Sequence, residues 1–466
     1  MTTENPSVRA STTAPPAAAP PTTATPAAAP GVRSTGLRLG ALFGPVIFGV
    51  TAAGVALPEV ARALEASPSA VAWVLTAHAL ALGIGTALAG RAADARGIRF
   101  VLLTGGLLLA AGAVVCLTAP HIGVLVAGRF LLAAGSGAMS SVALALAASS
   151  PPDRRPGILA IFGAVMSVFS AGATLAGGVV TEWLTWRLTL VLPALSLLAL
   201  PLVLRQTAAR PGSGRSLDLG GALLLTATAA SFLILIQSSA LSLSVGTVTV
   251  TAVLLVLAGA GLVVRTVRVP ESFVPRSIVG DSMFVRAALT GAGVYAGLFG
   301  AMYAVPQLLV REHDWSVLSI GLWLLPGAVL GAALSRYAAS RRDGRAGVLL
   351  MVTALACAVL LASVPFADGA PVLVIAGAST GFAAFAVTQL VTTELLSASI
   401  APQQRGGAVS LLNLTFFVGG GVGSAAAGAL AKSMELTGVV GVLAVFPLLG
   451  AVFALTLPGP GRPRGN

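Results

Sequence analysis

The chain has 466 residues, of which 56% are hydrophobic and only 9% are charged, and its mean hydropathy is +0.95. Soluble globular proteins average about 45–50% apolar and about 25% charged residues, so this composition excludes a soluble fold and predicts an integral protein of the lipid bilayer. The net charge of +12 does not indicate a nucleic-acid partner, because the basic residues are spread over short connectors rather than gathered in one patch.

The N-terminal residues 1–36 are rich in Thr, Pro and Ala and contain almost no branched apolar side chains. A segment of this composition cannot bury a core, so we predict a disordered cytoplasmic tail. The first apolar run after it is as long as a complete membrane span, so a cleaved signal peptide is not expected.

Fourteen apolar runs follow, each long enough for a helix that crosses the hydrocarbon core, which needs about 20 residues. The connectors are short, and no soluble domain interrupts the series. The sequence therefore predicts an all-α integral membrane protein with spans at residues 37–58, 70–90, 100–119, 123–147, 157–181, 187–204, 218–238, 245–264, 285–309, 317–338, 347–366, 371–396, 405–430 and 437–457.

The distribution of basic residues predicts the orientation of these spans. With the N-terminus inside, 22 of the 27 basic residues fall on the cytoplasmic side and 4 on the outer side, as the positive-inside rule requires. The remaining one, Arg129, lies within a span. We expect a multi-pass protein of the cell membrane with both termini in the cytoplasm, including a C-terminal tail at 458–466.

The connector between the second and third spans reads Gly-Arg-Ala-Ala-Asp-Ala-Arg-Gly-Ile-Arg at residues 90–99. Its glycines permit a tight turn with closely approaching helices, and its aspartate can pair with an arginine across the turn. The pattern resembles the loop signature of the major facilitator superfamily. The alternative is that its arginines only anchor the topology. The resemblance implies a gating role for Gly90, Arg91, Asp94, Gly97 and Arg99.

Arg129 lies inside the fourth span, where an arginine costs about 2.5–3.5 kcal/mol on insertion scales and usually faces the bundle interior. Ser136 and Ser140 follow on the same face of the helix and form a polar stripe with it. The segment resembles the span-four motif of the same superfamily, whose arginine is linked to proton coupling. The alternative is a packing arginine that reaches toward the membrane interface.

Residues 170–193 resemble the span-five motif of the antiporter branch of this superfamily. Gly177 and Gly178 match its helix-packing glycines, and such small residues let membrane helices approach closely. Ala173 and Thr174 stand where the motif usually has Gly-Pro, which leaves the direction of transport open.

Together these motifs resemble the fourteen-span drug:proton antiporter branch. The resemblance implies a major facilitator-type bundle of two six-helix halves with an inserted helix pair. The corresponding ranges are an N-terminal half at 37–204, an inserted pair at 218–264 and a C-terminal half at 285–457.

Titratable groups deep inside the spans are scarce. Members of the branch often carry an aspartate and an asparagine in span one, where this chain has Gly49 and Gly54. His78, in span two, has a reference pKa suited to proton exchange, although a packing role for its aromatic ring is the alternative. The coupling candidates are Arg129, His78 and Glu394.

Polar and aromatic side chains within the spans are candidates for lining a substrate cavity, although amides in membrane helices also bond neighbouring helices. No cluster of fixed charges lies at mid-depth, so we expect an uncharged or weakly amphipathic organic solute. The candidates are Trp73, Ser136, Tyr295, Tyr303, Gln307, Gln389 and Asn413.

The sequence has no Gly-x-x-x-x-Gly-Lys-Ser/Thr loop, and therefore no nucleotide site of that type to drive transport. With the resemblance, this predicts a secondary active transporter that exports a small lipophilic compound by proton antiport with alternating access. Uptake or facilitated transport, and a non-transporting sensor or channel, are the alternatives. No enzymatic activity, cofactor or metal is expected, and a monomer is expected to suffice.

Overall fold

A computed structural model describes residues 31–205, 207, 212, 218–238, 241–269, 272–340, 345–400 and 405–457. Helices and their connecting turns account for these residues, and no strand occurs among them. The 3-10 helices are η1 (Gly44–Gly49), η2 (Leu192–Leu195) and η3 (Val364–Ala367). The α-helices are α1 (Val32–Phe43), α2 (Thr51–Ala63), α3 (Pro68–Arg96), α4 (Ile98–Thr118), α5 (Ile122–Ala148), α6 (Arg155–Trp183), α7 (Trp186–Val191), α8 (Ser196–Leu204), α9 (Leu219–Ile236), α10 (Val245–Arg268), α11 (Arg276–Val279), α12 (Ser282–His313), α13 (Val317–Ala339), α14 (Arg345–Ser363), α15 (Pro371–Ser399), α16 (Arg405–Leu430), α17 (Leu436–Leu443) and α18 (Val445–Ala454).

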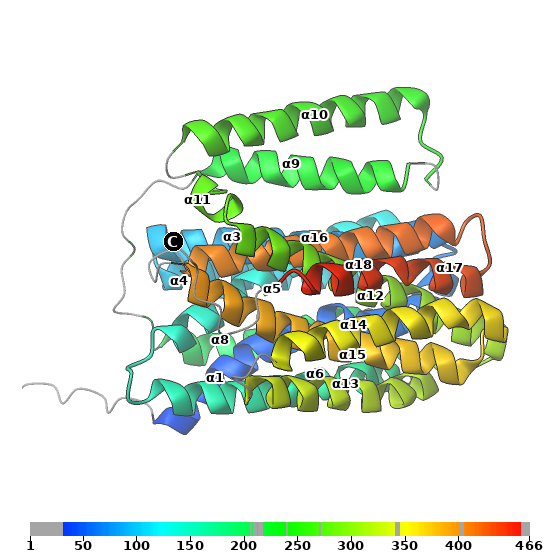
Figure 1. Ribbon diagram of the computed structural model, residues 1–466, viewed down its shortest axis with the longest axis horizontal. Coiled ribbons are helices and arrows are strands. Elements are labelled where there is room, and N and C mark those ends of the chain that lie inside the picture. The colour runs from blue at the N-terminus through cyan, green and yellow to red at the C-terminus, as the bar shows by residue number, and fades with distance from the viewer. Residues whose placement is uncertain are drawn as a thin grey trace, which may run out of the picture. The chain divides into compact units, whose positions relative to one another are not determined.

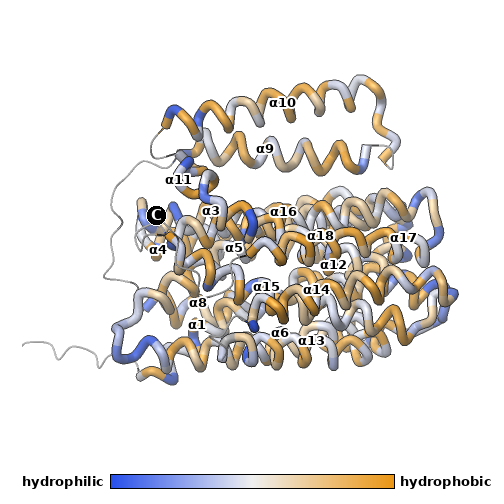
Figure 2. Tube along the Cα trace, in the orientation of Figure 1, coloured by the Kyte–Doolittle hydropathy of each residue, from blue (hydrophilic) through white to orange (hydrophobic). Residues whose placement is uncertain are grey.

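These helices provide fourteen candidate membrane spans, which confirms the predicted number. Four spans combine consecutive helices, one of them being the eleventh, in which η3 follows α14. Each of the three 3-10 helices contains a proline, which lacks the backbone N–H that a continuous helix needs. Pro45 lies in η1 and divides the first span, and Pro193 lies in η2 and divides the sixth. The last span is divided between α17 and α18. Hydrophilic residues gather at the helix ends, as a membrane bundle requires (Figure 2).

The start of the first span corrects a prediction. Helix α1 begins at Val32, so the prediction of a disordered tail at 1–36 is wrong for residues 32–36. The cause is tertiary: a Cβ atom on Gly36 would lie 2.8 Å from Cβ of Ile161, so the start of α1 packs directly on α6. Residues 1–30 and the predicted tail at 458–466 lie outside the described residues.

For description, α1–α8 are the N-terminal half and α12–α18 the C-terminal half, and their two most extensive contacts form two seams. At the first seam, α3 packs along α16, where Thr76 Oγ1 and Ser424 Oγ lie 2.8 Å apart. At the second, α6 packs along α13, where a Cβ on Gly321 would lie 2.6 Å from the carbonyl oxygen of Thr174. Small residues allow this close approach. The resulting van der Waals contact between helices stabilises the bundle in lipid, where the hydrophobic effect does not drive helix association.

The helices α9 and α10 form a pair beside the bundle (Figure 1). Helix α9 contacts α16 and α3, whereas α10 packs mainly on α9. Of the α10 residues, only Thr251 and Ala258 are buried, and its outer face exposes valine and leucine side chains. An apolar exposed face of this kind is suited to contact with lipid.

Asp218, the residue that caps α9, holds one end of this pair in place. Its carboxylate accepts hydrogen bonds from Nε of Arg265 at 2.6 Å, from the N–H of Gly221 at 2.9 Å and from the N–H of Phe273 at 2.7 Å. Arg91, on α3, donates to the carbonyl oxygen of Phe273 at 2.8 Å. The connector at Phe273 therefore joins the inserted pair to the end of α3.

Replacement of Gly177 by alanine tests the close packing of α6. A Cβ at this position would lie 2.7 Å from the backbone oxygen of Ala52 on α2, so the helices must separate. We expect a loss of about 1–3 kcal/mol, as for other overpacked sites, measured as a lower unfolding midpoint in detergent. Gly172→Ala on the same helix is the matched control, because nothing lies within 4 Å of its added Cβ. Equal midpoints for the two variants would contradict the packing argument.

Replacement of Asp218 by asparagine tests the junction, and the effect depends on pH. Burial alone would raise the pKa of Asp218, but the hydrogen bonds from Gly221, Phe273 and Arg265 outweigh it and lower the pKa below its usual value. The stability contributed by the ionised carboxylate is therefore complete above about pH 4 and is lost as the pH falls through the folded-state pKa.

We expect Asp218→Asn to destabilise the protein by about 1–3 kcal/mol at pH 7, because it removes charged hydrogen bonds. The difference between variant and wild type is expected to shrink as thermal unfolding is repeated toward pH 3. Asp153→Asn is the control, because its contact with Arg154 is 3.6 Å long and exposed. A difference independent of pH would show that the carboxylate charge at Asp218 is not what stabilises the junction.

Candidate functional site

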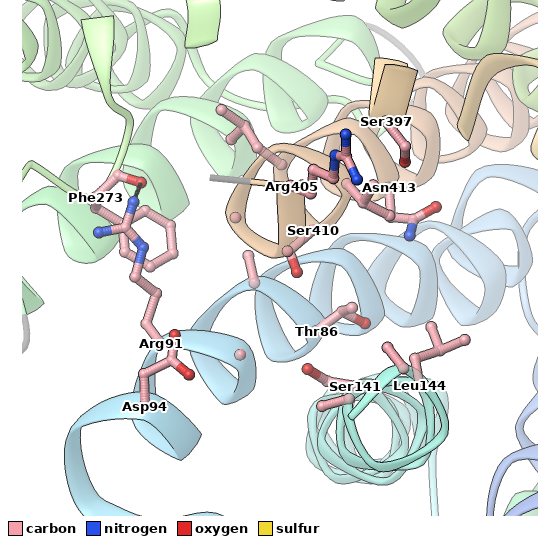
Figure 3. Close-up of a pocket in the computed structure, with 18 of the residues that line it drawn as sticks. Thr86, Arg91, Asp94, Ser141, Leu144, Phe273, Ser397, Arg405, Ser410 and Asn413 are labelled. Atoms are coloured by element: carbon pink, nitrogen blue, oxygen red, sulfur yellow. Dashed lines mark hydrogen bonds between the residues drawn. The ribbon is translucent and has the colours of Figure 1, made fainter. Parts of the chain in front are cut away.

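A cavity of about 500 Å³ opens between the two halves at the end of the bundle where α3 meets α4. We call this the signature end, because it carries the Gly-x-x-x-Asp loop. The walls come from α3, α5 and α6 of one half and from α15 and α16 of the other (Figure 3). Pockets that bind small organic ligands measure about 300–1,000 Å³, so this cavity has a suitable size.

The lining of the cavity combines apolar, hydroxyl, amide and charged groups. Hydroxyls of Thr86, Ser141 and Ser410 and the amide of Asn413 line it together with leucine and alanine side chains (Figure 3). The charged lining residues are Arg91, Asp94, Arg155 and Arg405. Such a lining can bind an organic molecule that is partly polar and partly apolar.

Two of the lining arginines occupy corresponding turns of the two halves. Arg155 opens α6 and donates from Nη2 to the carbonyl oxygen of Ser150 at 3.0 Å. Arg405 opens α16 and donates from Nε to the carbonyl oxygen of Ile400 at 3.2 Å. Each bond reaches back five residues and closes the turn before its helix. In the sequence both arginines are topology signals, and their matching places before the fifth and thirteenth spans could have indicated this shared role.

The structure divides the residues of the predicted loop signature between two roles. Gly90, Arg91 and Asp94 line the cavity, whereas Arg99 is exposed. Gly97 joins α3 to α4 with φ of 91°, a left-handed conformation that favours glycine. The guanidinium carbon of Arg91 lies 5.4 Å from the ring centre of Phe273, so cation–π contact adds to its hydrogen bond.

A chain of hydrogen bonds leads from the cavity into the C-terminal half. Asn413 lines the cavity, and its Oδ1 accepts from Nε2 of Gln389 at 2.9 Å. Oε1 of Gln389 accepts from the hydroxyl of Tyr295 on α12. Aromatic rings surround Tyr295: the ring centres of Phe385 and Phe416 lie 4.4 and 4.9 Å from it. Three predicted cavity residues thus form one cluster, of which Asn413 lines the cavity.

The other predicted cavity residues lie elsewhere. The hydroxyl of Tyr303 donates to the carbonyl oxygen of Pro68, at the first residue of α3 and therefore at the end opposite the cavity. Trp73 and Gln307 also belong to this end, and Trp73 Nε1 and Gln307 Oε1 are buried without a hydrogen-bond partner among the described residues. Ser136 is buried and donates to the carbonyl oxygen of Leu132 on its own helix. None of these four lines the cavity.

Arg129 is completely buried, and backbone carbonyl groups of three other elements surround its guanidinium. Nη1 donates to Leu190 of α7 at 2.8 Å, Nε donates to Val74 of α3 at 3.4 Å, and Nη2 donates to Gly49 of η1. Carbonyl dipoles can compensate a buried charge when they are held in place by packing. The predicted interior position of Arg129 is therefore confirmed. The hydrogen-bond partners of its guanidinium are backbone oxygens.

His78 lies beside this arginine, and Gly49 makes room for it. Its ring is completely buried, and neither ring nitrogen has a hydrogen-bond partner among the described residues. A Cβ atom on Gly49 would lie 2.1 Å from Nε2 of His78. Glu394, the third coupling candidate, is exposed on α15 and lines neither this site nor the cavity.

Within the described part of the chain, no group of three histidine, cysteine or acidic residues is placed to hold a metal ion. The site thus consists of the cavity, the Tyr295 cluster that adjoins it, and the buried pair of Arg129 and His78. What this arrangement offers chemically is a partly polar, partly apolar cavity lining and a buried imidazole beside a buried guanidinium.

Comparisons with known proteins agree with this geometry. The family profile of the Major Facilitator Superfamily matches residues 39–393 and 287–466. A puromycin resistance protein of Streptomyces alboniger is 28% identical over 398 residues, which cover 82% of this chain and 78% of that protein. A multidrug resistance protein B homolog of Mycobacterium tuberculosis is 27% identical over 397 residues, covering 81% and 72%. A D-xylose-proton symporter of known structure shares the fold, with a TM-score of 0.62, 15% identity and coverage of 92% of this chain and 99% of that chain.

Thiol labelling tests whether the cavity is open to water. Ser410 lines it, whereas Ser424 on the same helix is completely buried against Thr76. We expect Ser410→Cys to react with a small charged maleimide at least about 10-fold faster than Ser424→Cys, because reaction needs an accessible thiolate. The native Cys116 and Cys357 are buried and give a low background. Equal rates for the two variants would contradict an open cavity at this end.

Proposed function

This chain belongs to the Major Facilitator Superfamily, and from that premise we propose that it exports a small lipophilic organic compound, a drug or secondary metabolite, in exchange for protons. The family and the named relatives are transport proteins, so the chain is a multi-pass membrane transporter and not an enzyme. The compound, the coupling ion and the direction of transport belong to the proposal.

The observation that carries the proposal is the cavity shared by the two halves. It lies at the signature end, while at the opposite end Tyr303 of α12 bonds the start of α3 and Gly428 of α16 packs on Ala72. A site between two halves that is reached from one end suits alternating access, in which the halves rock about it. The seams of small residues are the surfaces on which the halves would move.

The charges at the signature end support a cytoplasmic location for the cavity mouth. Arg91, Arg155 and Arg405 line it, and cytoplasmic segments of membrane proteins carry an excess of arginine and lysine. We infer that both termini are cytoplasmic and that the membrane is the cell membrane. An exporter loads its substrate from this side, so a cavity reached from the cytoplasm is the loading state.

The lining of the cavity supports an amphipathic substrate. Hydroxyls and the Asn413 amide provide hydrogen bonds among apolar walls, and the rings around Tyr295 lie next to them. The resistance proteins of Streptomyces alboniger and Mycobacterium tuberculosis support the drug class. One chain encloses the cavity, so we propose that a monomer transports.

Proton exchange is supported by the buried pair of Arg129 and His78. Among the acidic residues in the described ranges, only Asp218 has a side chain as little exposed as 6%, and it caps α9 at the signature end, so no carboxylate of these ranges lies at mid-depth to carry the coupling. His78 is the buried group whose ordinary titration range lies near physiological pH. A proton bound in the interior and a substrate bound in the cavity can then alternate.

The proposal is tested by accumulation of ethidium and a panel of lipophilic antibiotics in cells that express the protein. We expect wild type to lower accumulation, and a protonophore to abolish the difference from cells without the protein. Ser410→Trp is expected to abolish export, because the indole fills the cavity. Ser433→Trp, an exposed position beyond the far end of α16, is the matched control and is expected to export normally.

Other outcomes of this experiment identify the alternatives. Higher accumulation in expressing cells would indicate uptake, and export that persists with the protonophore would rule out coupling to protons. No effect on any compound, with the protein folded in the membrane, would favour a sensor or a transporter of another substrate class. Export by Ser410→Trp equal to wild type would show that the cavity is not the substrate site.

A further inference from the structure

We propose that His78 is the residue that binds and releases the coupled proton, and that it does so from the space that a side chain at position 49 would otherwise fill. The inference rests on the proposed proton exchange and names the group that performs it. It commits to one side chain on α3, to one glycine on η1 that accommodates it, and to Arg129 as the charge that opposes its protonated form.

The ring of His78 packs directly against Gly49. A Cβ on Gly49 would lie 2.1 Å from Nε2, 2.5 Å from Cε1 and 3.2 Å from Cδ2 of His78. These distances place the edge of the imidazole ring directly on the backbone of η1. A side chain at position 49 would therefore clash with an imidazole at position 78. The imidazole fits because residue 49 is glycine.

The two ring nitrogens of His78 make no hydrogen bond with the described residues. A neutral imidazole has one nitrogen that donates and one that accepts. Neither nitrogen of His78 has a partner among the described residues, although the ring is completely buried. Buried polar atoms are nearly always satisfied, so a ring used only for packing would be replaced by an apolar one at lower cost. We infer that the ring finds its hydrogen-bond partner in another step of the cycle.

Arg129 is the charged residue that acts on His78. Arg129 on α5 bonds the carbonyl oxygen of Gly49, the residue against which the ring packs. It is the charged group that acts on His78, and the Cys116 thiol of α4 is a titratable neighbour of Arg129. The facing part of η1 carries glycine, proline and apolar residues, and α16 contributes glycine and Ser424 nearby. The buried carboxylate among the described residues, that of Asp218, bonds Arg265 at the start of α9 and does not compensate a second positive charge here.

These facts define the proton step. The lone pair of the unprotonated ring nitrogen accepts H⁺ from H₃O⁺, which gives imidazolium and H₂O, and release to a water molecule forms H₃O⁺ again. Imidazolium and guanidinium repel each other, so protonation favours separation of Arg129 from the Gly49 carbonyl. Since the carbonyls around Arg129 belong to η1, α3 and α7, that separation alters how three spans of the N-terminal half are held.

The test uses three substitutions and one transplant, with ethidium efflux from energised inverted vesicles as the transport readout. His78→Asn keeps polarity and His78→Phe keeps an aromatic ring. We expect both to fold and to lose proton-driven efflux by at least about 10-fold, together with its pH dependence. Gly49→Asp alone is expected to be inactive, because its side chain meets the ring. His121→Asn, at an exposed turn, is the control and retains efflux.

The double variant Gly49→Asp with His78→Ala places a carboxylate in the vacated space. We expect it to recover proton-driven efflux, with a pH profile moved toward acid, because a carboxylate titrates at lower pH than imidazole. Efflux by His78→Phe with an unchanged pH profile would overturn the proposal. So would a folded double variant without proton coupling, because the space would then not be the proton site.

A readout without substrate separates this inference from the proposed export. The chain has three histidines, so a protein with His121→Gln and His313→Gln reports on His78 alone. We expect its imidazole NMR resonance in detergent to shift as the pH is lowered, because the ring then takes up a proton. If wild type moves no ethidium but this resonance titrates, the proposed export of this compound is contradicted and the assignment of His78 as the proton-binding residue is kept. If wild type exports with proton coupling and the resonance does not move, the assignment of His78 is overturned.

Discussion

One buried positive charge organises the N-terminal half of this protein. Arg129 sits in the interior of the bundle, where an unpaired charge is unfavourable, and it is compensated by carbonyl oxygens of Gly49, Val74 and Leu190. Those three atoms belong to η1, α3 and α7, so a single side chain from α5 fixes three other elements against one another. Any motion of these helices must break or replace one of these hydrogen bonds, which makes the site responsive to a second charge nearby.

The packing of small residues determines where the two halves can move. Glycines along α6, α13 and α16 bring backbones into contact, as Gly321 does with Thr174 and Gly428 with Ala72. Smooth seams of this kind hold helices by close packing rather than by long interlocking side chains. The cavity lies where the seam between α3 and α16 widens at the signature end, so rocking of the halves changes access to the groups that line it.

The inserted helix pair is tied to that same end. Asp218 bonds Arg265 and the backbone of Phe273, and Arg91 of α3 bonds the other side of Phe273. The pair is thus joined to a residue of the loop signature as well as to its neighbours α3 and α16. A change in the position of α3 at the cavity mouth therefore reaches the connector that leads into the C-terminal half.

The sequence alone determined the number of spans and favoured an interior position for Arg129, because hydropathy and a lone charge within an apolar run are properties of short segments. It predicted a connector over residues 90–99, but α3 continues to Arg96 and the turn is made by Gly97, which has a positive φ. Tertiary structure decided which side chains and backbone groups contact one another. Tyr295 meets Gln389 94 residues away, Tyr303 turns to Pro68 235 residues away, and the first turn of α1 forms on α6. Likewise only the fold brings the bare backbone of Gly49 to the ring of His78. Such contacts depend on which helix faces are apposed, and a sequence that is apolar on nearly every face carries little periodic signal to specify them.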